Sequence, residues 1–346
     1  MNRYVFFALL AAVLFGASTP LAKWLVGTQP PILLAGLLYL GSGVGLTLIR
    51  LIRDRGWQAS GMAAGEWPWL LGAMFFGGMA GPVALMFGLT STSGSTASLL
   101  LNLESVLTAL IAWVVFRENA DRRIVIGMTA MLAGGVVLSW PSDFNGQQDW
   151  TGAVCLALAC LCWAIDNNLT RRVSASDALF IAASKGVVAG GVNTVLALSL
   201  GATLPTGFTL LVTLAVGFVG YGVSLVLFVL ALRGLGTART GAYFSIAPWM
   251  GAAIAVLVFG ESTPMAFWLA AALMGLGVWL HLTESHVHEH THLPMAHEHE
   301  HTHDEHHQHE HPFAWSGAGA HQHAHTHPFF RHTHAHFPDI HHRHEH

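Results

Sequence analysis

Ten apolar stretches fill most of the first 283 residues of this 346-residue chain. A helix needs about 20 apolar residues to cross the hydrocarbon core of a bilayer. Charged residues make up only 10% of the chain, whereas soluble domains carry roughly a quarter, and this composition argues against a water-soluble enzyme. We therefore predict an all-α polytopic membrane protein with ten transmembrane helices at 4–26, 31–51, 67–89, 94–116, 122–140, 150–170, 177–200, 207–231, 238–259 and 264–283.

The positive charges divide the loops into two classes. Five loops contain neither Lys nor Arg: 27–30, 90–93, 141–149, 201–206 and 260–263. The segments at the opposite helix ends contain Arg3, Arg50, Arg53, Arg55, Arg117, Arg122, Arg123, Arg171, Arg172, Arg233 and Arg239. Because positively charged loops stay on the cytoplasmic side, we predict a multi-pass protein of the cell inner membrane with both termini in the cytoplasm.

The two halves of the apolar region resemble each other. Residues 95–138 align without a gap with residues 238–281, so that Glu118 falls on Glu261. Each half holds five predicted helices, and an odd number makes the two halves cross the membrane in opposite senses. Inverted repeats of this kind are typical of transporters, with the substrate site between the halves near the midplane. We predict two five-helix domains, at 4–140 and 150–283.

Several motifs in these halves resemble a known family. The motifs are Phe116-Arg117-Glu118, the corresponding Phe259-Gly260-Glu261, and the opening helix at 14–23. Together they are similar to the EamA-type members of the drug/metabolite transporter superfamily. The resemblance covers 4–283 and implies ten helices, a central cavity formed by helices 1–4 and 6–9, and export of small metabolites or drugs by alternating access. One departure is Glu104 in the fourth helix, where the ninth helix has Ala247.

Three ionisable side chains fall well inside predicted helices: Glu104, Asp166 and Lys185. At 1.5 Å per residue they lie about 18, 9 and 14 Å from the cytoplasmic helix ends, so that Asp166 and Lys185 could touch. One interpretation is a substrate pathway in which Glu104 accepts a proton or cation, with amides from Asn102 and Asn167. The other is a structural ion pair beside a protonated Glu104, because such residues usually face a cavity or a partner. We expect few aromatic residues in this interior.

The C-terminal tail has a different composition. All 24 histidines lie at or after His281, and 23 of them fall in 286–346. No apolar pattern that could build a core is present there, so we predict a disordered cytoplasmic domain. Imidazole binds nickel, cobalt and zinc, and the predicted metal ligands are His286, His288, His290, His292, His297, His299, His301, His303, His306, His307, His309, His311, His321, His323, His325 and His327. A solvated spacer is the alternative.

These features leave three functions open. The first is secondary active efflux of nickel, cobalt or zinc, with the tail gathering ions at the inner mouth. The second is export of a small organic metabolite or drug, with a tail that only buffers or senses metal. The third is a membrane anchor for a metal store. No enzyme motif or nucleotide-binding fingerprint occurs in a suitable setting, no cofactor is required, and the lack of a basic stripe argues against nucleic acid. The expected partners are the bilayer and the solute or metal ion, and a homodimer stays open.

Overall fold

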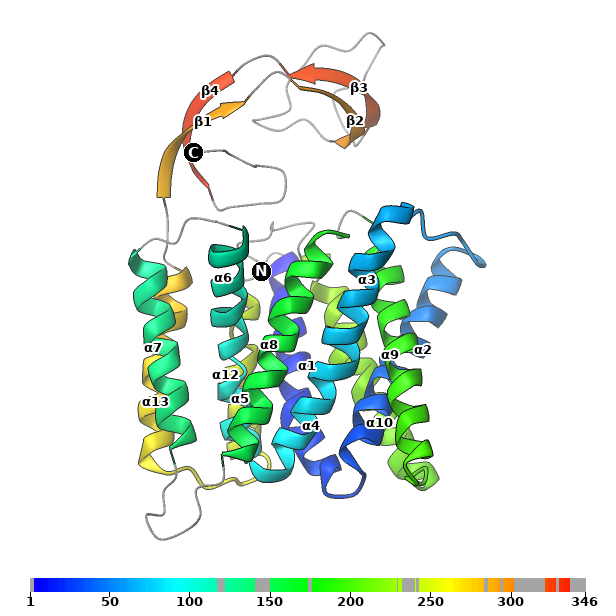
Figure 1. Ribbon diagram of the computed structural model, residues 1–346, viewed down its shortest axis with the longest axis vertical. Coiled ribbons are helices and arrows are strands. Elements are labelled where there is room, and N and C mark those ends of the chain that lie inside the picture. Colours follow the sequence, from blue (N-terminus) through cyan, green and yellow to red (C-terminus); the bar gives the residue numbers. More distant parts are fainter. Residues whose placement is uncertain are drawn as a thin grey trace. The chain divides into compact units, whose positions relative to one another are not determined.

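The computed structural model describes most of the apolar region and four short pieces of the tail. The described residues are 3–116, 122–140, 150–173, 176–228, 230–231, 240, 243–282, 286–292, 295–301, 321–327 and 330–336. They form two compact units, one ending at Glu284 and the other beginning at Ser285. The first unit, the helical body, and the second, the tail, are both drawn in Figure 1.

The helical body is a bundle of roughly parallel and antiparallel helices (Figure 1). Its first half contains α1 (Arg3–Val26), α2 (Pro31–Arg53), η1 (Ala64–Glu66), α3 (Trp67–Ala73), η2 (Met74–Ala80), α4 (Gly81–Ser91), α5 (Gly94–Leu100), α6 (Leu103–Phe116) and α7 (Arg122–Ser139). Its second half contains α8 (Thr151–Arg171), α9 (Ala178–Ser199), α10 (Gly207–Gly217), η3 (Phe218–Val223), α12 (Ala247–Leu257) and α13 (Met265–Leu282).

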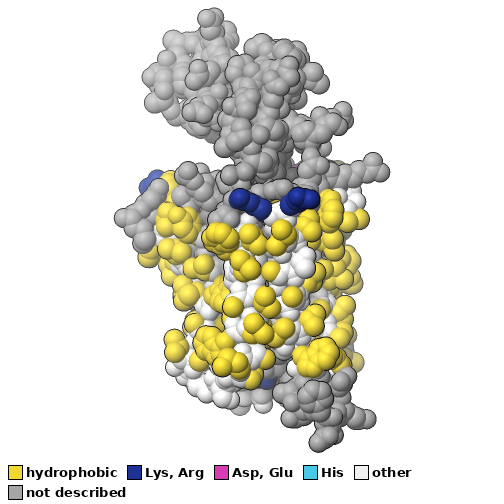
Figure 2. Space-filling model, turned by 90° about the vertical axis from the view of Figure 1, so that its left-hand side faces the viewer, with side chains coloured by type: hydrophobic (Ala, Val, Ile, Leu, Met, Phe, Trp, Pro, Cys, Tyr) yellow, Lys and Arg dark blue, Asp and Glu magenta, His cyan; other side chains and the backbone are white. Residues whose placement is uncertain are grey.

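Eight of the described helices are long and apolar enough to cross a membrane. They coincide with the first eight predicted stretches, including composite spans over Ala64–Ser91 and Gly207–Phe228. Helices α12 and α13 lie in the last two predicted stretches, and their described apolar segments are shorter than the other eight. Residues 238, 239, 241 and 242, at the start of the predicted ninth helix, lie outside the described residues. The chain is therefore a multi-pass helical membrane protein. Figure 2 shows one face as a broad hydrophobic band with Lys and Arg side chains mostly towards one end.

Helices from the two halves of the chain pack directly on each other. The closest pairs are α2 with α9, α7 with α13, α4 with α8, and α1 with α12. Glycines allow these approaches: a Cβ on Gly43 of α2 would overlap the backbone of α9 at Val187, and a Cβ on Gly186 would meet Gly43. The Gly186/Gly190 spacing thus marks a helix contact, as small residues do in membrane interfaces.

Three spans are irregular in their middle. Residues 74–80 and 218–223 form π-helical turns in the third and eighth spans, and the fourth span breaks at Leu101 and Asn102, between α5 and α6. Pro82 lies in the first turn of α4, directly after the first π-helical turn, and Pro248 lies in the first turn of α12. Pro20, in contrast, sits inside an unbroken α1. Irregular turns free backbone carbonyls, which need partners inside a membrane.

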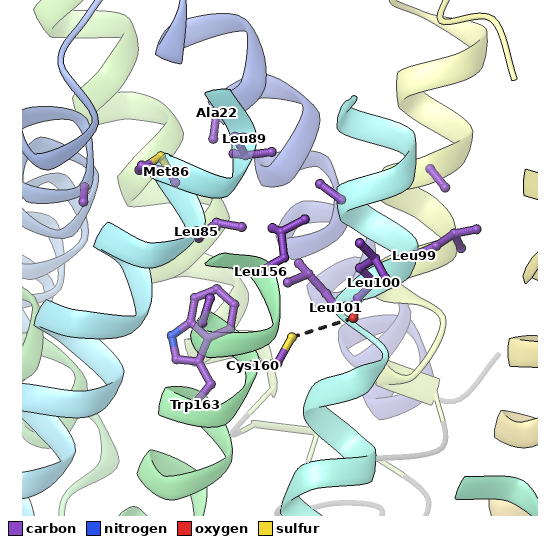
Figure 3. Close-up of a cluster of buried hydrophobic side chains, with 14 of the residues drawn as sticks. Ala22, Leu85, Met86, Leu89, Leu99, Leu100, Leu101, Leu156, Cys160 and Trp163 are labelled. Atoms are coloured by element: carbon purple, nitrogen blue, oxygen red, sulfur yellow. Dashed lines mark hydrogen bonds between the residues drawn. The ribbon is translucent and has the colours of Figure 1, made fainter. Parts of the chain in front are cut away.

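A cluster of buried apolar side chains fills one half of the body. It includes Leu85 and Leu89 of α4, Leu100 of α5 and Leu156 of α8 (Figure 3). These positions are near the helix ends that contain Lys23, which we call the Lys23 end. Ala22 of α1 belongs to the same cluster. The interior is therefore packed mainly with apolar side chains on this side, and the ionisable residues follow further along the same helices.

At the opposite end, which we call the Arg50 end, an ion-pair network joins α2 to the start of α9. Arg50 Nε lies 3.2 Å and Arg53 Nη2 lies 2.6 Å from Asp177 Oδ2. The Asp177 side chain also accepts a hydrogen bond from the backbone N–H of Leu179 and so caps α9. Burial alone would raise the pKa of Asp177, but the bonds from Arg53, Arg50 and Leu179 outweigh it and lower that pKa to about 2.

We expect Asp177→Asn to lower thermal stability in a pH-dependent way. Because the folded-state pKa lies below the ordinary value of 3.8, ionised Asp177 stabilises the fold above about pH 4, and this stabilisation disappears as the pH falls toward 2. An asparagine side chain can still cap the helix, so the change at pH 7 reports the effect of the charge alone. The free energy of unfolding should fall by about 1 kcal/mol, because solvent screens the partly exposed ion pairs. Thermal unfolding in detergent should show a Tm difference from wild type at pH 7 that narrows at pH 3; an equal difference at both values would contradict this.

The tail differs from the predicted disorder, because its described residues form four strands. Strand β1 (His286–His292) pairs antiparallel with β4 (Phe330–His336), and β2 (Met295–His301) pairs with β3 (His321–His327). Disorder was predicted from the absence of an apolar pattern that could build a core. The His-x-His alternation has the two-residue period of a strand, and that period is compatible with the observed pairing.

Candidate functional site

Asp166 of α8 and Lys185 of α9 form an ion pair inside the body. Lys185 Nζ lies 2.6 Å from Asp166 Oδ1 and 2.7 Å from Oδ2. The hydroxyl of Thr170 donates to Oδ1 at 2.9 Å, and a Cβ on Gly77 would overlap Oδ2. Asp166 is buried. The predicted contact between these two residues is confirmed, and both carboxylate oxygens are already occupied.

Glu104 lies in a different local setting. It is in the first turn of α6, directly after the break in the fourth span, where the free N–H groups and the helix dipole favour negative charge. Asn167 Nδ2 of α8 donates to Glu104 Oε1 at 2.8 Å. Among the described residues, the hydrogen-bond partner of this carboxylate is therefore an amide and not a cation. Glu104 is half-buried.

The amides predicted with Glu104 behave differently from each other. Asn167 joins α8 to α6, whereas Asn102 donates to Leu99 O in its own turn at 2.9 Å. Asn102 sits in the break itself, so it stabilises the bend that places Glu104. The break was not predicted from the sequence, because no proline or glycine marks it.

The π-helical turn η2 is held by three donors from other helices. Tyr39 Oη of α2 donates to Gly77 O at 2.7 Å, and Trp163 Nε1 of α8 donates to the same carbonyl at 3.1 Å. Asn193 Nδ2 of α9 lies 3.3 Å from Met79 O. These bonds satisfy carbonyls that the π-helical turn leaves available. Tyr39 and Trp163 were absent from the predicted site, because their partner is a backbone atom.

A row of aromatic rings continues from Tyr39. Its ring centroid is 5.6 Å from that of Tyr221 in η3, and Tyr221 is 5.9 Å from Phe15 of α1. Phe15 is 5.5 Å from Phe244, which is 4.7 Å from Phe228. All five residues are half-buried. The expectation of an aromatic-poor interior is therefore wrong: helical periodicity in an all-apolar span does not reveal which face carries the rings.

The aromatic row and the ionisable residues share one neighbourhood. Trp163, Asp166 and Asn167 lie on consecutive turns of α8, at spacings that bring side chains together. Tyr39 and Trp163 both donate to Gly77 O, and Gly77 lies directly against the Asp166 carboxylate, so Tyr39 is close to the ion pair. The site thus contains an ion pair, a carboxylate on an amide, and several ring faces.

Potential metal ligands are sparse in the part of the body that the structure describes. No group of three or more His, Cys, Asp or Glu residues there could hold a metal ion. Cys160 Sγ is buried and lies 3.7 Å from Leu100 O (Figure 3). In the tail, the structure gives backbone positions for the predicted ligands within the four strands. The predicted ligands His303, His306, His307, His309 and His311 lie outside the described residues.

The glutamate of the Phe-Gly-Glu motif connects the two halves at the Lys23 end. Glu261 Oε1 accepts from the N–H of Gly94 and Oε2 from the N–H of Ser95, each at 2.8 Å. Nearby, Lys23 Nζ donates to Leu89 O at 2.6 Å. A carboxylate of the second half therefore caps α5 of the first half, and α5 leads into the break before Glu104.

This arrangement defines a multi-pass helical membrane protein with polar and aromatic side chains grouped among its helices. Residues 2–140 match the model of the EamA-like transporter family, in agreement with the resemblance indicated by the motifs in this part of the chain.

Two relatives match this chain over a longer region. The chain is 25% identical over 285 residues to an "uncharacterized transporter" of Methanothermobacter thermautotrophicus, covering 78% of this chain and 83% of that protein. It is 24% identical over 300 residues to the "uncharacterized transporter YyaM" of Bacillus subtilis, covering 83% and 94%. A solved crystal structure with 20% identity has a TM-score of 0.62 and covers 80% of this chain and 94% of its own, which shows a shared fold.

Proposed function

We propose that this protein is a secondary active transporter of the inner membrane that exports a small organic solute. The observation that carries the proposal is Glu104, a carboxylate deep in a predicted span, at the start of a half-helix, held by an amide of the other half. Half-helix ends that meet near the midplane are the usual sites of substrate binding in secondary transporters. The match of residues 2–140 to a transporter family agrees with this. The distribution of Lys and Arg supports cytoplasmic termini.

The proposed mechanism is alternating access between two inverted five-helix halves. Three features support the inversion. π-helical turns occur in both the third and eighth spans. In the gapless alignment, the turn at Leu101 and Asn102 falls within one residue of the turn at Ser245 and Ile246 before α12. In addition, α1 packs on α12 just as α8 packs on α6. The apolar cluster at the Lys23 end would close the outer side in this conformation.

An organic solute suits the body better than a metal ion. Both oxygens of Asp166 are held by Lys185, and an intramembrane ammonium repels a dication. Aromatic rings beside the carboxylate supply apolar contact area, which a small organic molecule uses and a metal ion does not.

The histidines of the tail support a second function, which is the binding or efflux of divalent nickel, cobalt or zinc. The register of the tail pairs histidine with histidine: His288 with His334 and His290 with His332 in one ladder, and His299 with His323 in the other. Directly paired residues of an antiparallel ladder have Cα atoms about 4.5–5.5 Å apart. Backbone pairing therefore brings several imidazole-bearing residues together, which supports a metal-binding tail.

We expect the tail to bind metal independently of transport by the body. The full chain purified in detergent should bind several Ni²⁺ or Zn²⁺ ions at pH 7.5 in equilibrium dialysis, and a chain ending at Glu284 should bind almost none while inserting normally in the membrane. Binding should fall steeply below about pH 6.5, because protonated imidazole is not a ligand. Equal metal binding by both chains would refute a metal-binding tail. Unchanged cellular nickel, cobalt and zinc on overproduction would refute metal efflux.

The transport role of Glu104 is tested by Glu104→Gln. In everted vesicles screened against a panel of organic solutes and metals, we expect the variant to lose at least about 90% of wild-type transport, since an interaction with a charged group contributes roughly 1.5–3 kcal/mol. The matched control is Glu66→Gln, which changes an acid at the end of η1 and should transport normally. Wild-type transport by a folded Glu104→Gln variant would refute the role of Glu104.

A further inference from the structure

The four strands of the tail share one register. We call the β1–β4 pair the outer ladder and the β2–β3 pair the inner ladder, and both are antiparallel (Figure 1). The outer ladder ends at the pair His292–Phe330, and the inner ladder begins at the pair Met295–His327. Two residues separate these pairs on each side of the chain, so the inner ladder continues the register of the outer one. A single hairpin register therefore covers all four strands.

Histidine meets histidine at three positions of each ladder, and we call each such pair a rung. The histidines of β1 occupy even-numbered positions and those of β2 odd-numbered positions, and their partners in β4 and β3 change in the same way. A change on one side of the hairpin alone would pair the inner histidines with other residue types. The sequence on both sides therefore preserves the pairing, and the rungs not yet named are His286–His336, His297–His325 and His301–His321.

The rungs of a ladder belong to one face, and the acidic residues of the strands belong to the other. Successive residues of a strand alternate between two faces, and the rungs of each ladder fall at every second position. Glu289, Glu298 and Glu300 fall at the positions in between. Within the described strands, the rungs therefore offer imidazole nitrogens as metal ligands and no carboxylates. Such a set suits zinc, nickel and copper, whereas magnesium, calcium and manganese prefer oxygen.

Two neighbouring rungs bring four histidines together. Their Cα atoms mark a rectangle about 5 Å across the ladder and about 7 Å along it. Four imidazoles complete the tetrahedral coordination of a zinc ion. Both possible pairs of neighbours in a ladder use its middle rung, which is His288–His334 in the outer ladder and His299–His323 in the inner ladder. Each ladder therefore has room for one such four-histidine site at a time.

We propose that each ladder binds one divalent ion of the zinc, nickel or cobalt class between its middle rung and a neighbouring rung. This inference rests on the metal-binding function proposed for the tail and names the ligands of that function. A two-stranded ladder alone is marginally stable in water. Because the four-histidine site exists only in paired strands, the binding free energy of the ion adds to the stability of the pairing. The two ions therefore hold β1 to β4 and β2 to β3.

The first test measures amide hydrogen exchange by mass spectrometry on the full-length protein in detergent at pH 7.5, with Zn²⁺, Mg²⁺ or EDTA. At a Zn²⁺ concentration about ten times its dissociation constant or above, exchange in all four strands should be at least about tenfold slower than in EDTA, because the ion binds the paired strands and not the open ones. Mg²⁺ should have no effect. Equal exchange with Zn²⁺ and EDTA, or equal slowing by both metals, would overturn the inference.

The second test moves the middle rung of the outer ladder to the opposite face without changing the composition of the chain. The variant carries Val287→His, His288→Val, His334→Ala and Ala335→His, and positions 287 and 335 are themselves paired. No two neighbouring rungs then remain on either face. Since loss of even an outer-shell partner of a metal ligand costs about 10–100-fold in affinity, the Zn²⁺ concentration that half-protects β1 and β4 should rise at least about tenfold. The inner ladder should respond as in the wild type.

The matched control moves an end rung of the same ladder to the same new positions. It carries His286→Val, Val287→His, Ala335→His and His336→Ala. The other two rungs stay neighbours on their original face, so the response of β1 and β4 to Zn²⁺ should stay within about threefold of wild type, far below the loss expected for the middle rung. Equal half-protecting concentrations in the two variants would show that the number of histidines matters and not the rungs, and this would contradict the inference.

Zinc binding by the full chain and by a chain ending at Glu284 separates this inference from the function on which it rests. If the two chains bind the same amount of Zn²⁺ in equilibrium dialysis, the metal-binding function of the tail fails. If the full chain binds more Zn²⁺ but the two rung variants behave alike, the metal-binding function stands and the assignment of the ligands is wrong.

Discussion

Lys185→Met should sharply reduce the yield of folded protein, because it leaves the Asp166 carboxylate in the body interior without its counter-charge. Both side chains are largely buried, with 15% and 11% of their side-chain surface exposed. Removing one partner of a buried ion pair costs about 3–5 kcal/mol. We expect low recovery of monodisperse protein after size-exclusion chromatography and a Tm well below that of the wild type.

The double variant Asp166→Asn/Lys185→Met is the matched control for this prediction. It removes both charges and leaves an amide that can still accept the hydrogen bond from Thr170. We expect it to recover most of the lost stability, because no uncompensated charge remains. If the single variant were as stable as the wild type, the pair would have no structural role. If the stable double variant transported nothing, the pair would belong to the transport mechanism.

Gly77→Ala should be the second strongly destabilising change. A Cβ at this position would overlap Asp166 Oδ2 and approach Asp166 Cβ at 2.8 Å. The new methyl group therefore has to displace either η2 or the carboxylate that binds Lys185. Overpacking of a core typically costs about 1–3 kcal/mol, and we expect the upper end of that range, because the ion pair is strained at the same time.

Gly191→Ala provides the comparison, because a Cβ on Gly191 of α9 would meet no atom within 4 Å. Since alanine favours a helix over glycine by about 1 kcal/mol, this variant should be as stable as wild type or slightly more so. Thermal unfolding of both variants in the same detergent measures the difference. An equally stable Gly77→Ala variant would show that η2 can shift without cost.

The positions of the membrane spans could be predicted from the sequence, because a helix that crosses lipid is apolar along its whole length. For the same reason, hydropathy does not indicate which face of each helix packs against the other helices. Glu104, Asp166 and Lys185 were found because charge is costly in a membrane. The contact of Asp166 with Lys185 was predicted from their similar depths on two consecutive antiparallel helices.

The rest of the site depends on features that a single sequence does not mark. Tyr39 and Trp163 were missed because both donate to the carbonyl of Gly77, which becomes available only through a π-helical turn. The break before Glu104 contains Leu101 and Asn102, and neither residue ends a helix as reliably as proline or glycine does. The strands of the tail were missed because the prediction weighed the absence of a core and not the period of the histidines.

The cap that Glu261 places on α5 has a mechanical consequence. A helix whose first N–H groups are bonded by a carboxylate from the opposite half cannot keep those bonds when the halves tilt apart. Any opening of the Lys23 end that withdraws Glu261 would expose two amide donors and loosen the first turn of α5. Since α5 ends at the bend before Glu104, the position of that acid would then report whether the outer side is shut or open.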